Sequence, residues 1–299
     1  TILTTEFFSS LYNQIPNINF LFFKSEHKSI YGLFRLSTQI IEINPDLIID
    51  LHDVLRTKII RLFLAYKFNR ISVIDKGRKQ KKSLINGQIF RRLKPMHQRY
   101  ADALSYEKMN INLDLFKTYN KININDKTHE FDLNKRLIGI APFARHNCKE
   151  YSLGNILKVI DLIGPAYQIL IFGGPGEEEK KIKKICKEKT NTYLVSSNYS
   201  LDEQMAVISN LSLMISMDSA NGHIASLFGV NVITVWGATH PFMGYSPLNQ
   251  PEKNSIIPDL EKFPKVPVTI YGSRCPKDYV NAINSIQPEK ILKRFNELV

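Results

Sequence analysis

The chain has 299 residues, 43% of them hydrophobic and 23% charged, with a formal net charge of +12. These proportions are typical of a folded globular protein and exclude a disordered one, and the length allows two domains. No run approaches the roughly 18 consecutive apolar residues that a membrane-spanning helix needs. Cys148, Cys186 and Cys275 are far apart in the sequence and form no CxxC pair. We therefore expect neither a disulfide framework nor a zinc site, and a cytoplasmic location.

Helices and strands are expected to alternate along the first half. Residues 1–15 carry apolar side chains at helical spacing, and Pro16 would end that helix. Further strands are expected at 18–23, 45–51 and 70–74, and further helices at 27–41, 54–68 and 96–118. This alternation predicts a mostly parallel sheet. Because a doubly wound domain normally begins with a strand that leads into its first helix, we expect a strand ahead of Thr1.

A basic segment interrupts this pattern between residues 76 and 99. It holds nine Lys or Arg and no Asp or Glu, at positions 76, 78, 79, 81, 82, 91, 92, 94 and 99. An anionic membrane surface, a phosphorylated substrate or nucleic acid would be attracted by such charge, and a solvated basic loop is the alternative. Since the segment has no recognition motif and only Phe90 as an aromatic residue, we expect no nucleic-acid partner.

The second half alternates more regularly, after a polar link at 119–135. We divide the chain into an N-terminal domain (1–130), a C-terminal domain (131–285) and a final helix (286–299). Strands of the second domain are expected at 136–142, 168–174, 192–195, 211–216 and 230–237, and helices at 152–163, 177–188, 200–210 and 219–229. This pattern predicts a Rossmann-like domain of about six strands.

Two loops of the second domain are candidates for an anion site. "APFARHNCKEYS" carries Arg145, His146 and Lys149 between a strand and a helix, where cations suit a phosphate group. "FGGPGEEE" allows a close backbone approach but lacks both the dinucleotide GxGxxG pattern and the Walker lysine. Glycines of a tight turn are enough to explain this second loop.

A third candidate is "SMDSANGHIASLFG" at 216–229. Asp218 or Ser219 can cap the helix that begins there. Gly222 would leave the backbone open to a ligand, since glycine inside a first turn costs about 0.5–1 kcal/mol relative to alanine. His223 is either a buried structural histidine or part of the site. Asp202, near the start of another helix, is either an acceptor for a ribose or base, or an acid that favours the helix dipole.

Together with "PDLIIDLHDVLRTKII" and "WGATHP", these stretches resemble glycosyltransferase family 9, the ADP-heptose:lipopolysaccharide heptosyltransferases and their relatives. The resemblance runs in order from Thr1 to the last helix. It implies an α/β GT-B fold, in which two Rossmann-like, doubly wound parallel-sheet domains face each other across a cleft. The final helix would return towards the N-terminal domain.

The resemblance also implies the activity. The chain would be an inverting, metal-independent glycosyltransferase that moves a sugar, with heptose as the candidate, from a nucleotide-diphospho-sugar to a lipopolysaccharide core or a related cell-surface glycan. No cofactor besides the donor is expected. The basic segment 76–99 would hold the protein peripherally on the anionic inner membrane, in a salt-sensitive way.

Donor-binding residues are carried over by position. Lys149 would hold the diphosphate, and Asp202 would lie near the ribose. Asp218, Ser219 and Ala220 match the loop at the diphosphate and sugar, His223 would support that loop, and Arg145 and Gly222 complete the set. Because Arg145 replaces a small hydroxyl residue of better-known members, the identity of the donor is not carried over.

The family's first strand and the Gly-Asp loop after it are expected ahead of Thr1. The aspartate of that loop is the proposed general base for the acceptor hydroxyl. A chain that truly starts at Thr1 would lack this base, and the alternative is then a catalytically inactive sugar-nucleotide-binding protein.

Overall fold

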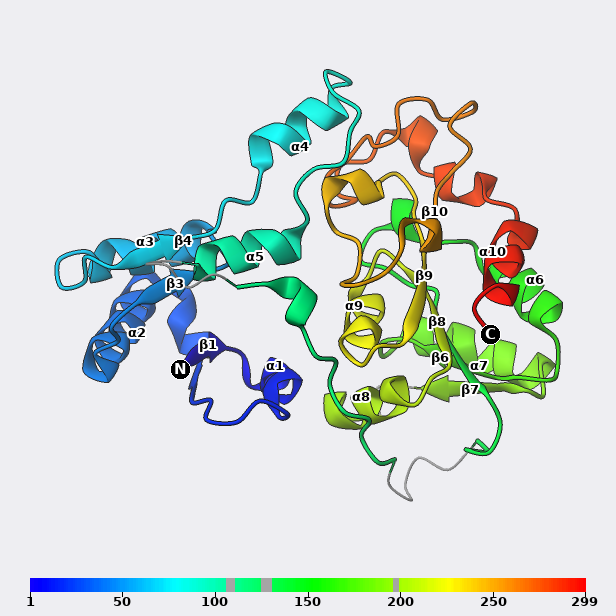
Figure 1. Ribbon diagram of the computed structural model, residues 1–299, viewed down its shortest axis with the longest axis horizontal. Coiled ribbons are helices and arrows are strands. Elements are labelled where there is room, and N and C mark those ends of the chain that lie inside the picture. Colours follow the sequence, from blue (N-terminus) through cyan, green and yellow to red (C-terminus); the bar gives the residue numbers. More distant parts are fainter. Residues whose placement is uncertain (106–110, 125–130, 196–198) are drawn as a thin grey trace. The chain divides into compact units, whose positions relative to one another are not determined.

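A computed structural model describes residues 1–105, 111–124, 131–195 and 199–299 (Figure 1). The chain forms two compact units. Unit 1 comprises Thr1–Arg78 and Lys94–Lys117, and unit 2 comprises Lys79–Leu93 and Thr118–Val299. Residues 79–93, which the sequence analysis places in the N-terminal domain, therefore pack with the second unit.

Unit 1 consists of short parallel strand pairs and helices. Its elements are β1 (Ile2–Thr4), α1 (Glu6–Ser9), β2 (Phe20–Phe22), α2 (Ile30–Ile43), β3 (Ile48–Asp50), α3 (Leu55–Leu64), β4 (Ile71–Val73) and α5 (Met96–Leu104). β1 pairs with β2, and β3 pairs with β4, both in parallel. Among the described residues these are two separate two-stranded sheets rather than one continuous sheet.

The helix expected over 1–15 is wrong at both ends. Residues 2–4 form a strand whose Leu3 pairs with Leu21, and α1 is followed by a 3₁₀ turn at Ser10–Tyr12. Ile2 and Thr4 are β-branched and favour extended backbone, and the neighbouring strand supplies the hydrogen bonds. The helix expected over 96–118 ends at Leu104, and residues 106–110 of that prediction lie outside the described residues.

α2 and α3 pack together to form the core of unit 1, around Leu33, Leu36, Ile60 and Leu64. α2 begins where the Ser29 hydroxyl accepts a hydrogen bond from the Gly32 amide at 3.0 Å. It ends at Asn44, whose left-handed backbone (φ 51°) stops the helix.

Unit 2 contains a six-stranded, all-parallel sheet. Its strands are β5 (Leu137–Ala141), β6 (Gln168–Phe172), β7 (Thr192–Val195), β8 (Leu213–Met217), β9 (Asn231–Val235) and β10 (Ser255–Ile256). Their order is β7-β6-β5-β8-β9-β10. The chain builds outward from β5 to one edge, then returns to the other side of β5, which is the order of a doubly wound nucleotide-binding sheet.

Helices cover both faces of this sheet. They are α6 (Leu153–Ile163), α7 (Glu177–Glu188), α8 (Leu201–Ser209), α9 (Ala220–Leu227) and α10 (Pro288–Asn296). Alternate strand residues such as Ile138, Leu213 and Ile233 share one core with α6, α7 and α10, whereas α9 packs on β8 and β9 at Ser216 and Val232. Continuous burial of the strands is what a sheet covered on both faces requires.

α10 belongs to the core of unit 2. Ile291 and Phe295 are buried in the cluster that includes Ile156 and Ile160 of α6, and the ring of Phe295 meets that of Tyr167 edge-on at 5.2 Å. The return of this helix towards the N-terminal domain remains a prediction.

The segment 79–93 is also part of unit 2. α4 (Arg78–Ile85) begins just before it, and Leu84 and Leu93 form a small core with Met243. The Leu93 amide donates to the Phe242 carbonyl at 2.9 Å. The alternative of a solvated basic loop is therefore wrong for residues 79–93. They form most of α4 and an irregular stretch after it, and both pack with unit 2. Within the described ranges, no helix combines the length and apolar character required to cross a bilayer.

We predict that Ile156→Ala lowers the free energy of unfolding by about 2–5 kcal/mol, because its side chain is fully buried between α6 and the sheet. Leu162→Ala lies on the same helix at a position 40% exposed and should cost less than about 1 kcal/mol. Urea unfolding of both variants checks the difference. Equal losses would contradict the packing of α6 described above.

Candidate functional site

Three loops of unit 2 converge because the strands before them are neighbours. β8 lies between β5 and β9, and all three run parallel. The loops that follow them therefore leave the same edge of the sheet, and they carry Lys149, Asp218 and Thr239. The order of the sheet reverses between β5 and β8, and this switch point is where doubly wound sheets bind ligands.

Asp218 joins the three loops. Lys149 Nζ lies 2.9 Å from Asp218 Oδ2, and Thr239 Oγ1 donates to the same oxygen at 3.1 Å. The side chains of Lys149 and Asp218 are only 13% and 9% exposed. Because little water screens this ion pair, loss of either partner would leave an uncompensated charge. The result is a fixed ammonium group at the carboxyl edge of the sheet, which suits a phosphate group.

The loop after β9 fixes the backbone that leads into Lys149. The Ala238 amide donates to the Cys148 carbonyl at 3.0 Å. Gly237 comes so close to this carbonyl that a Cβ atom at 237 would lie 2.0 Å from Cys148 O. Only glycine permits that approach.

Gly272 supports the aliphatic part of Lys149. Its φ of +88° is in the region that favours glycine, and a Cβ atom there would lie 2.7 Å from Lys149 Cδ. Cys148 Sγ donates to the Gly272 carbonyl at 3.2 Å. Cys148 and Cys275 are free thiols, and burial together with the neighbouring Cys148 thiol raises the pKa of Cys275 to about 12.

The start of α9 differs in detail from the expectation. Ser219 is the N-cap residue, but its side chain does not cap the helix, because its hydroxyl contacts Ser216 Oγ at 3.1 Å. The Asp218 carboxylate meets Lys149 and Thr239 instead. The prediction that the side chain of Asp218 or Ser219 caps this helix is therefore wrong. Ala220, in the first turn of α9, is exposed.

Gly222 and His223 have different environments. Gly222 is buried, and a Cβ atom there would lie 3.2 Å from Ser216 and 3.3 Å from Val232. Close packing of α9 on the sheet thus explains this glycine, rather than an open backbone. The His223 side chain remains in contact with solvent. Partial desolvation lowers the pKa of His223. The Asp218 carboxylate opposes that shift, and the Lys149 ammonium adds to it.

Arg145 and Asp202 both lie at exposed positions outside this cluster. Arg145 is exposed in the loop after β5. Asp202 is exposed in the first turn of α8, after β7, and two strands separate β7 from β8. At a strand spacing of about 4.8 Å, Asp202 follows a strand about 14 Å from β8. Ser200 and Glu203 cap α8 reciprocally.

Thr239, Gly237 and Gly272 were missed as site residues. Thr239 and Gly237 belong to "WGATHP", which was singled out only for its resemblance. Their partners, Asp218 and Cys148, lie 21 and 89 residues earlier in the numbering. The spacing within the loop therefore carries no signal of their role.

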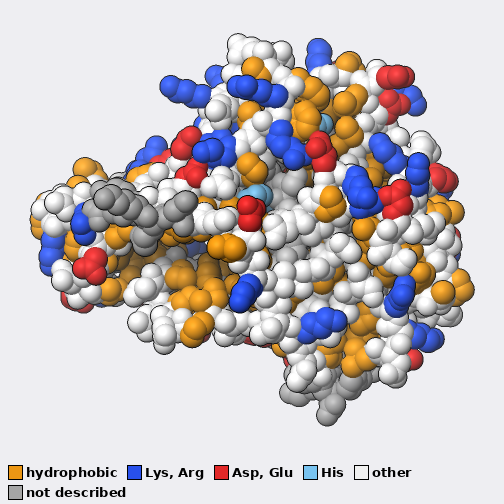
Figure 2. Space-filling model, viewed as in Figure 1, with side chains coloured by type: hydrophobic (Ala, Val, Ile, Leu, Met, Phe, Trp, Pro, Cys, Tyr) orange, Lys and Arg blue, Asp and Glu red, His pale blue; other side chains and the backbone are white. Residues whose placement is uncertain are grey.

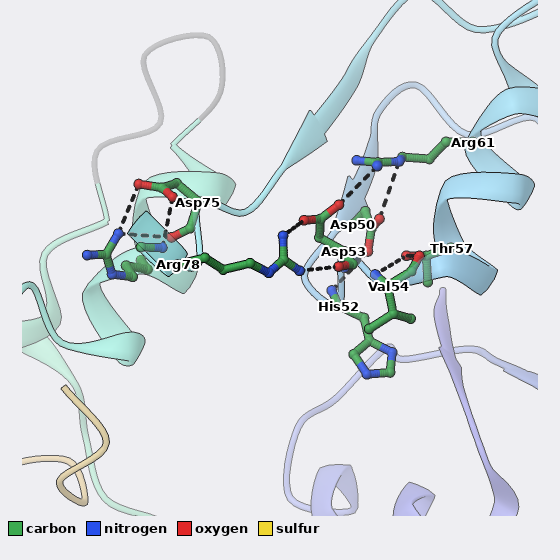
Figure 3. A network of polar contacts seen from close by, with 10 residues as sticks. Asp50, His52, Asp53, Val54, Thr57, Arg61, Asp75 and Arg78 are labelled. Atoms are coloured by element: carbon green, nitrogen blue, oxygen red, sulfur yellow. Dashed lines mark hydrogen bonds and ion pairs between the residues drawn. The ribbon is translucent and has the colours of Figure 1, made fainter. Parts of the chain in front are cut away.

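Unit 1 holds a polar network at the carboxyl end of β3 (Figure 3). Asp50 Oδ1 accepts hydrogen bonds from the amides of His52 and Asp53 at 2.9 and 2.8 Å. Asp53 has a φ of +37°, and its carboxylate contacts Arg61 Nη2 at 3.0 Å and Arg78. The hydrogen bond from Arg78 lowers the pKa of Asp53. The network holds a strained turn in place.

Much of the charge in segment 76–99 has partners elsewhere. Arg78 contacts Asp53, Arg92 contacts Glu252, Lys94 contacts Asp102 and Arg99 contacts Asp75. Lys81 is fully buried, with Nζ 2.9 Å from the Tyr245 hydroxyl and 4.0 Å from the centre of its ring. Lys79, Lys82 and Arg91 are exposed. Figure 2 shows Lys and Arg side chains around α4 at the top of the view.

No group of three or more His, Cys, Asp or Glu side chains that could hold a metal ion occurs among the described residues. The candidate site consists of one ammonium, one carboxylate, one hydroxyl and the start of α9. Such a set can bind an anion and accept hydrogen bonds from hydroxyl groups.

The model of glycosyltransferase family 9 (heptosyltransferase) matches residues 33–269. Lipooligosaccharide heptosyltransferase 2 of Campylobacter jejuni subsp. jejuni is 25% identical over 179 residues, which are 55% of this chain and 52% of that protein. Lipopolysaccharide heptosyltransferase 3 of Escherichia coli is 33% identical over 105 residues, which are 33% of this chain and 30% of that protein. The chain thus spans about half or less of the length of these curated relatives.

Solved structures show the same fold. A family 9 glycosyltransferase from Veillonella parvula superimposes with a TM-score of 0.72 at 18% sequence identity. The match covers 99% of this chain and 87% of the Veillonella chain. ADP-heptose lps heptosyltransferase II of E. coli superimposes with a TM-score of 0.68 at 16% sequence identity. That match covers 99% of this chain and 88% of the E. coli chain. The expected α/β class with parallel sheets is confirmed.

We predict that Gly237→Ala lowers the free energy of unfolding by about 3 kcal/mol, because the added methyl group would collide with the Cys148 carbonyl. Gly154→Ala is the matched control. Gly154 lies in α6 with nothing within 4 Å of an added Cβ atom, so this change should stabilise the protein by about 0.5–1 kcal/mol. Urea unfolding measures both, and opposite signs are the expected result.

Proposed function

We propose that this chain, which belongs to glycosyltransferase family 9 (heptosyltransferase), transfers a heptose from a nucleotide-diphospho-sugar to a lipopolysaccharide core or a related glycan. The observation that carries this proposal is the Lys149–Asp218–Thr239 cluster at the switch point of the sheet of unit 2. ADP-heptose is the candidate donor, because one solved structure with the same fold is an ADP-heptose lps heptosyltransferase.

In this proposal, Lys149 binds the donor diphosphate. Its ammonium group is held by Asp218 in a place with little solvent, where an electrostatic contact is worth more than in water. The amides at the start of α9 add to this, because the Ser219 side chain does not cap them. Asp218, apart from holding Lys149, has a carboxylate that can accept a hydrogen bond from a sugar hydroxyl.

Transfer would proceed by attack of the acceptor hydroxyl on the anomeric carbon. The bond between that carbon and the diphosphate oxygen breaks, and the configuration inverts. Lys149 and the α9 amides stabilise the negative charge that develops on the leaving nucleoside diphosphate, which is the role usually given to a metal ion. A general base accepts the proton of the acceptor hydroxyl, and none of the donor-binding residues named here is assigned to that role.

The remaining donor residues keep their proposed places. Asp202, at a distance from the cluster that a nucleotide can span, contacts the ribose. Ser219 and Ala220 line the diphosphate, and His223 supports the loop from the first turn of α9. Arg145 lies in the same loop as Lys149 and can contact a phosphate oxygen.

We predict that Lys149→Ala and Asp218→Ala each weaken the binding of ADP-heptose by roughly 10- to 100-fold, which corresponds to the loss of a charged hydrogen bond of about 1.5–3 kcal/mol. Lys158→Ala, at an exposed position of α6, is the control and should bind normally. Titration calorimetry on the full chain measures the affinity, and circular dichroism checks the fold. Unchanged affinity in both site variants would refute the proposed donor site.

The acceptor would lie at an anionic membrane, to which the protein binds peripherally. Because Lys81 is buried and several other cations are paired, the exposed Lys79, Lys82 and Arg91 are the residues of the basic segment that can meet lipid.

Replacement of Lys79, Lys82 and Arg91 by Gln should weaken binding to phosphatidylglycerol vesicles roughly 100-fold at low salt, since each cation contributes about 1 kcal/mol near such a surface. The control carries the same loss of charge at Lys158, Lys184 and Lys187, which are exposed on α6 and α7. Vesicle co-sedimentation at 50 and 300 mM salt tests the prediction. Binding that is insensitive to both salt and the triple substitution would contradict it.

A further inference from the structure

His240 is a buried histidine that the proposed mechanism does not use. It follows Thr239 in the loop after β9 and is only 2% exposed. Its Nδ1 accepts a hydrogen bond from the Phe242 amide at 3.1 Å. Burial lowers the pKa of His240 to about 4, so the ring is neutral at physiological pH. With Nδ1 acting as acceptor, the single ring proton is on Nε2.

That Nε2–H group has no hydrogen-bond partner among the residues that the structure describes. The indole Nε1–H of Trp236, in the same loop, is a second buried donor without a partner among the described residues. Buried N–H groups are rarely left unsatisfied in folded proteins, because the group loses its bond to water and gains nothing in exchange. Two unsatisfied donors in one loop beside a candidate site indicate that a bound ligand supplies a hydrogen-bond acceptor there.

The neighbours of His240 show what that partner could be. Thr239, whose Cα is about 3.8 Å from that of His240, donates to Asp218, which in turn holds Lys149. The ring of His240 also lies against two aromatic rings, with centroids 4.5 Å away for Phe242 and 5.4 Å away for Phe90. Phe90 is 58% exposed, so its ring packs on His240 while much of it remains open to solvent.

Phe90 is carried by the segment 79–93. This segment is fastened to the same loop by the bond from the Leu93 amide to the Phe242 carbonyl at 2.9 Å, and by the contact of Leu93 with Met243. Both anchors lie beside Phe90 without involving its side chain. The ring can therefore turn away while the segment stays in place.

We propose that the Nε2–H group of His240 donates a hydrogen bond to an oxygen of the bound nucleotide sugar, and that Phe90 covers this donor until the ligand displaces it. The proposal rests on the proposed function, since the ligand is the same nucleotide sugar. His240 is then a specificity-determining residue on the Thr239 side of the cluster. The oxygen belongs to the sugar or to the diphosphate.

The test compares His240→Asn with His27→Asn in the full chain. An asparagine can keep the hydrogen bond from the amide two residues ahead but has no group at the place of Nε2. His27 is a matched control, because it is also buried and accepts a main-chain amide through Nδ1 at 3.0 Å, while its Nε2 lies 3.5 Å from Glu26. Calorimetry with ADP and with ADP-heptose measures the affinities, and thermal melting measures stability.

The expected result is a fivefold to tenfold loss of ADP-heptose affinity in His240→Asn, about the value of one neutral hydrogen bond, with normal affinity in His27→Asn. Loss for ADP-heptose alone places the oxygen on the sugar, and equal loss for ADP places it on the diphosphate. Both outcomes support the proposal. Normal affinity for both ligands in His240→Asn overturns it, whatever the change in melting temperature.

Should His240→Asn fail to fold, the wild-type protein gives the answer. In a long-range ¹H–¹⁵N spectrum of its histidine rings, addition of ADP-heptose should move the Nε2–H signal of His240 downfield. An unmoved signal, in a protein shown by calorimetry to bind the ligand, overturns the inference and leaves the proposed function intact. A wild-type chain that binds neither nucleotide would overturn both.

Discussion

The all-parallel order of the sheet of unit 2 is the constraint on which the candidate site depends. Because the chain adds β6 and β7 outward from β5 and then returns to place β8 on its other side, two loops distant in sequence leave the sheet next to each other. The Lys149–Asp218 ion pair forms at that position. Glycines at 237 and 272 then allow two further loops to pack against the Cys148 carbonyl and the Lys149 side chain. The chemistry follows from topology first and from residue type second.

The elements of unit 2 could be predicted closely because their signals are local. Apolar strands such as 137–141 and amphipathic helices such as α6 and α7 show their period within one segment, and buried parallel strands are recognised by their composition. The first residues of the chain show the limit of this reasoning. Their helical spacing was real, but β2 offers Ile2–Thr4 a partner 18 residues away, and pairing of that kind leaves no mark on the segment itself.

The candidate site could be predicted from the sequence only in part. Asp218 and Lys149 were identified as candidates, whereas Thr239 became visible only through its contact with Asp218. The basic segment shows the converse. A count of charges along the chain suggested one continuous cationic surface, yet Asp53, Asp75 and Glu252 pair with three of its arginines from outside the segment. Net charge is additive along a sequence, whereas the field at a surface depends on which charges are neutralised in space.

The course of the chain between its two units limits how the protein can be divided or recombined. The chain passes from unit 1 to unit 2 after Arg78, returns after Leu93 and passes again after Lys117. A fragment that starts at Thr118 would therefore lack Leu84 and Leu93, which cover Met243 in the second unit. Exchange of unit 2 between relatives by a single crossover near residue 117 would separate two halves of one small core. A functional chimera would have to inherit residues 79–93 together with the unit on which they pack.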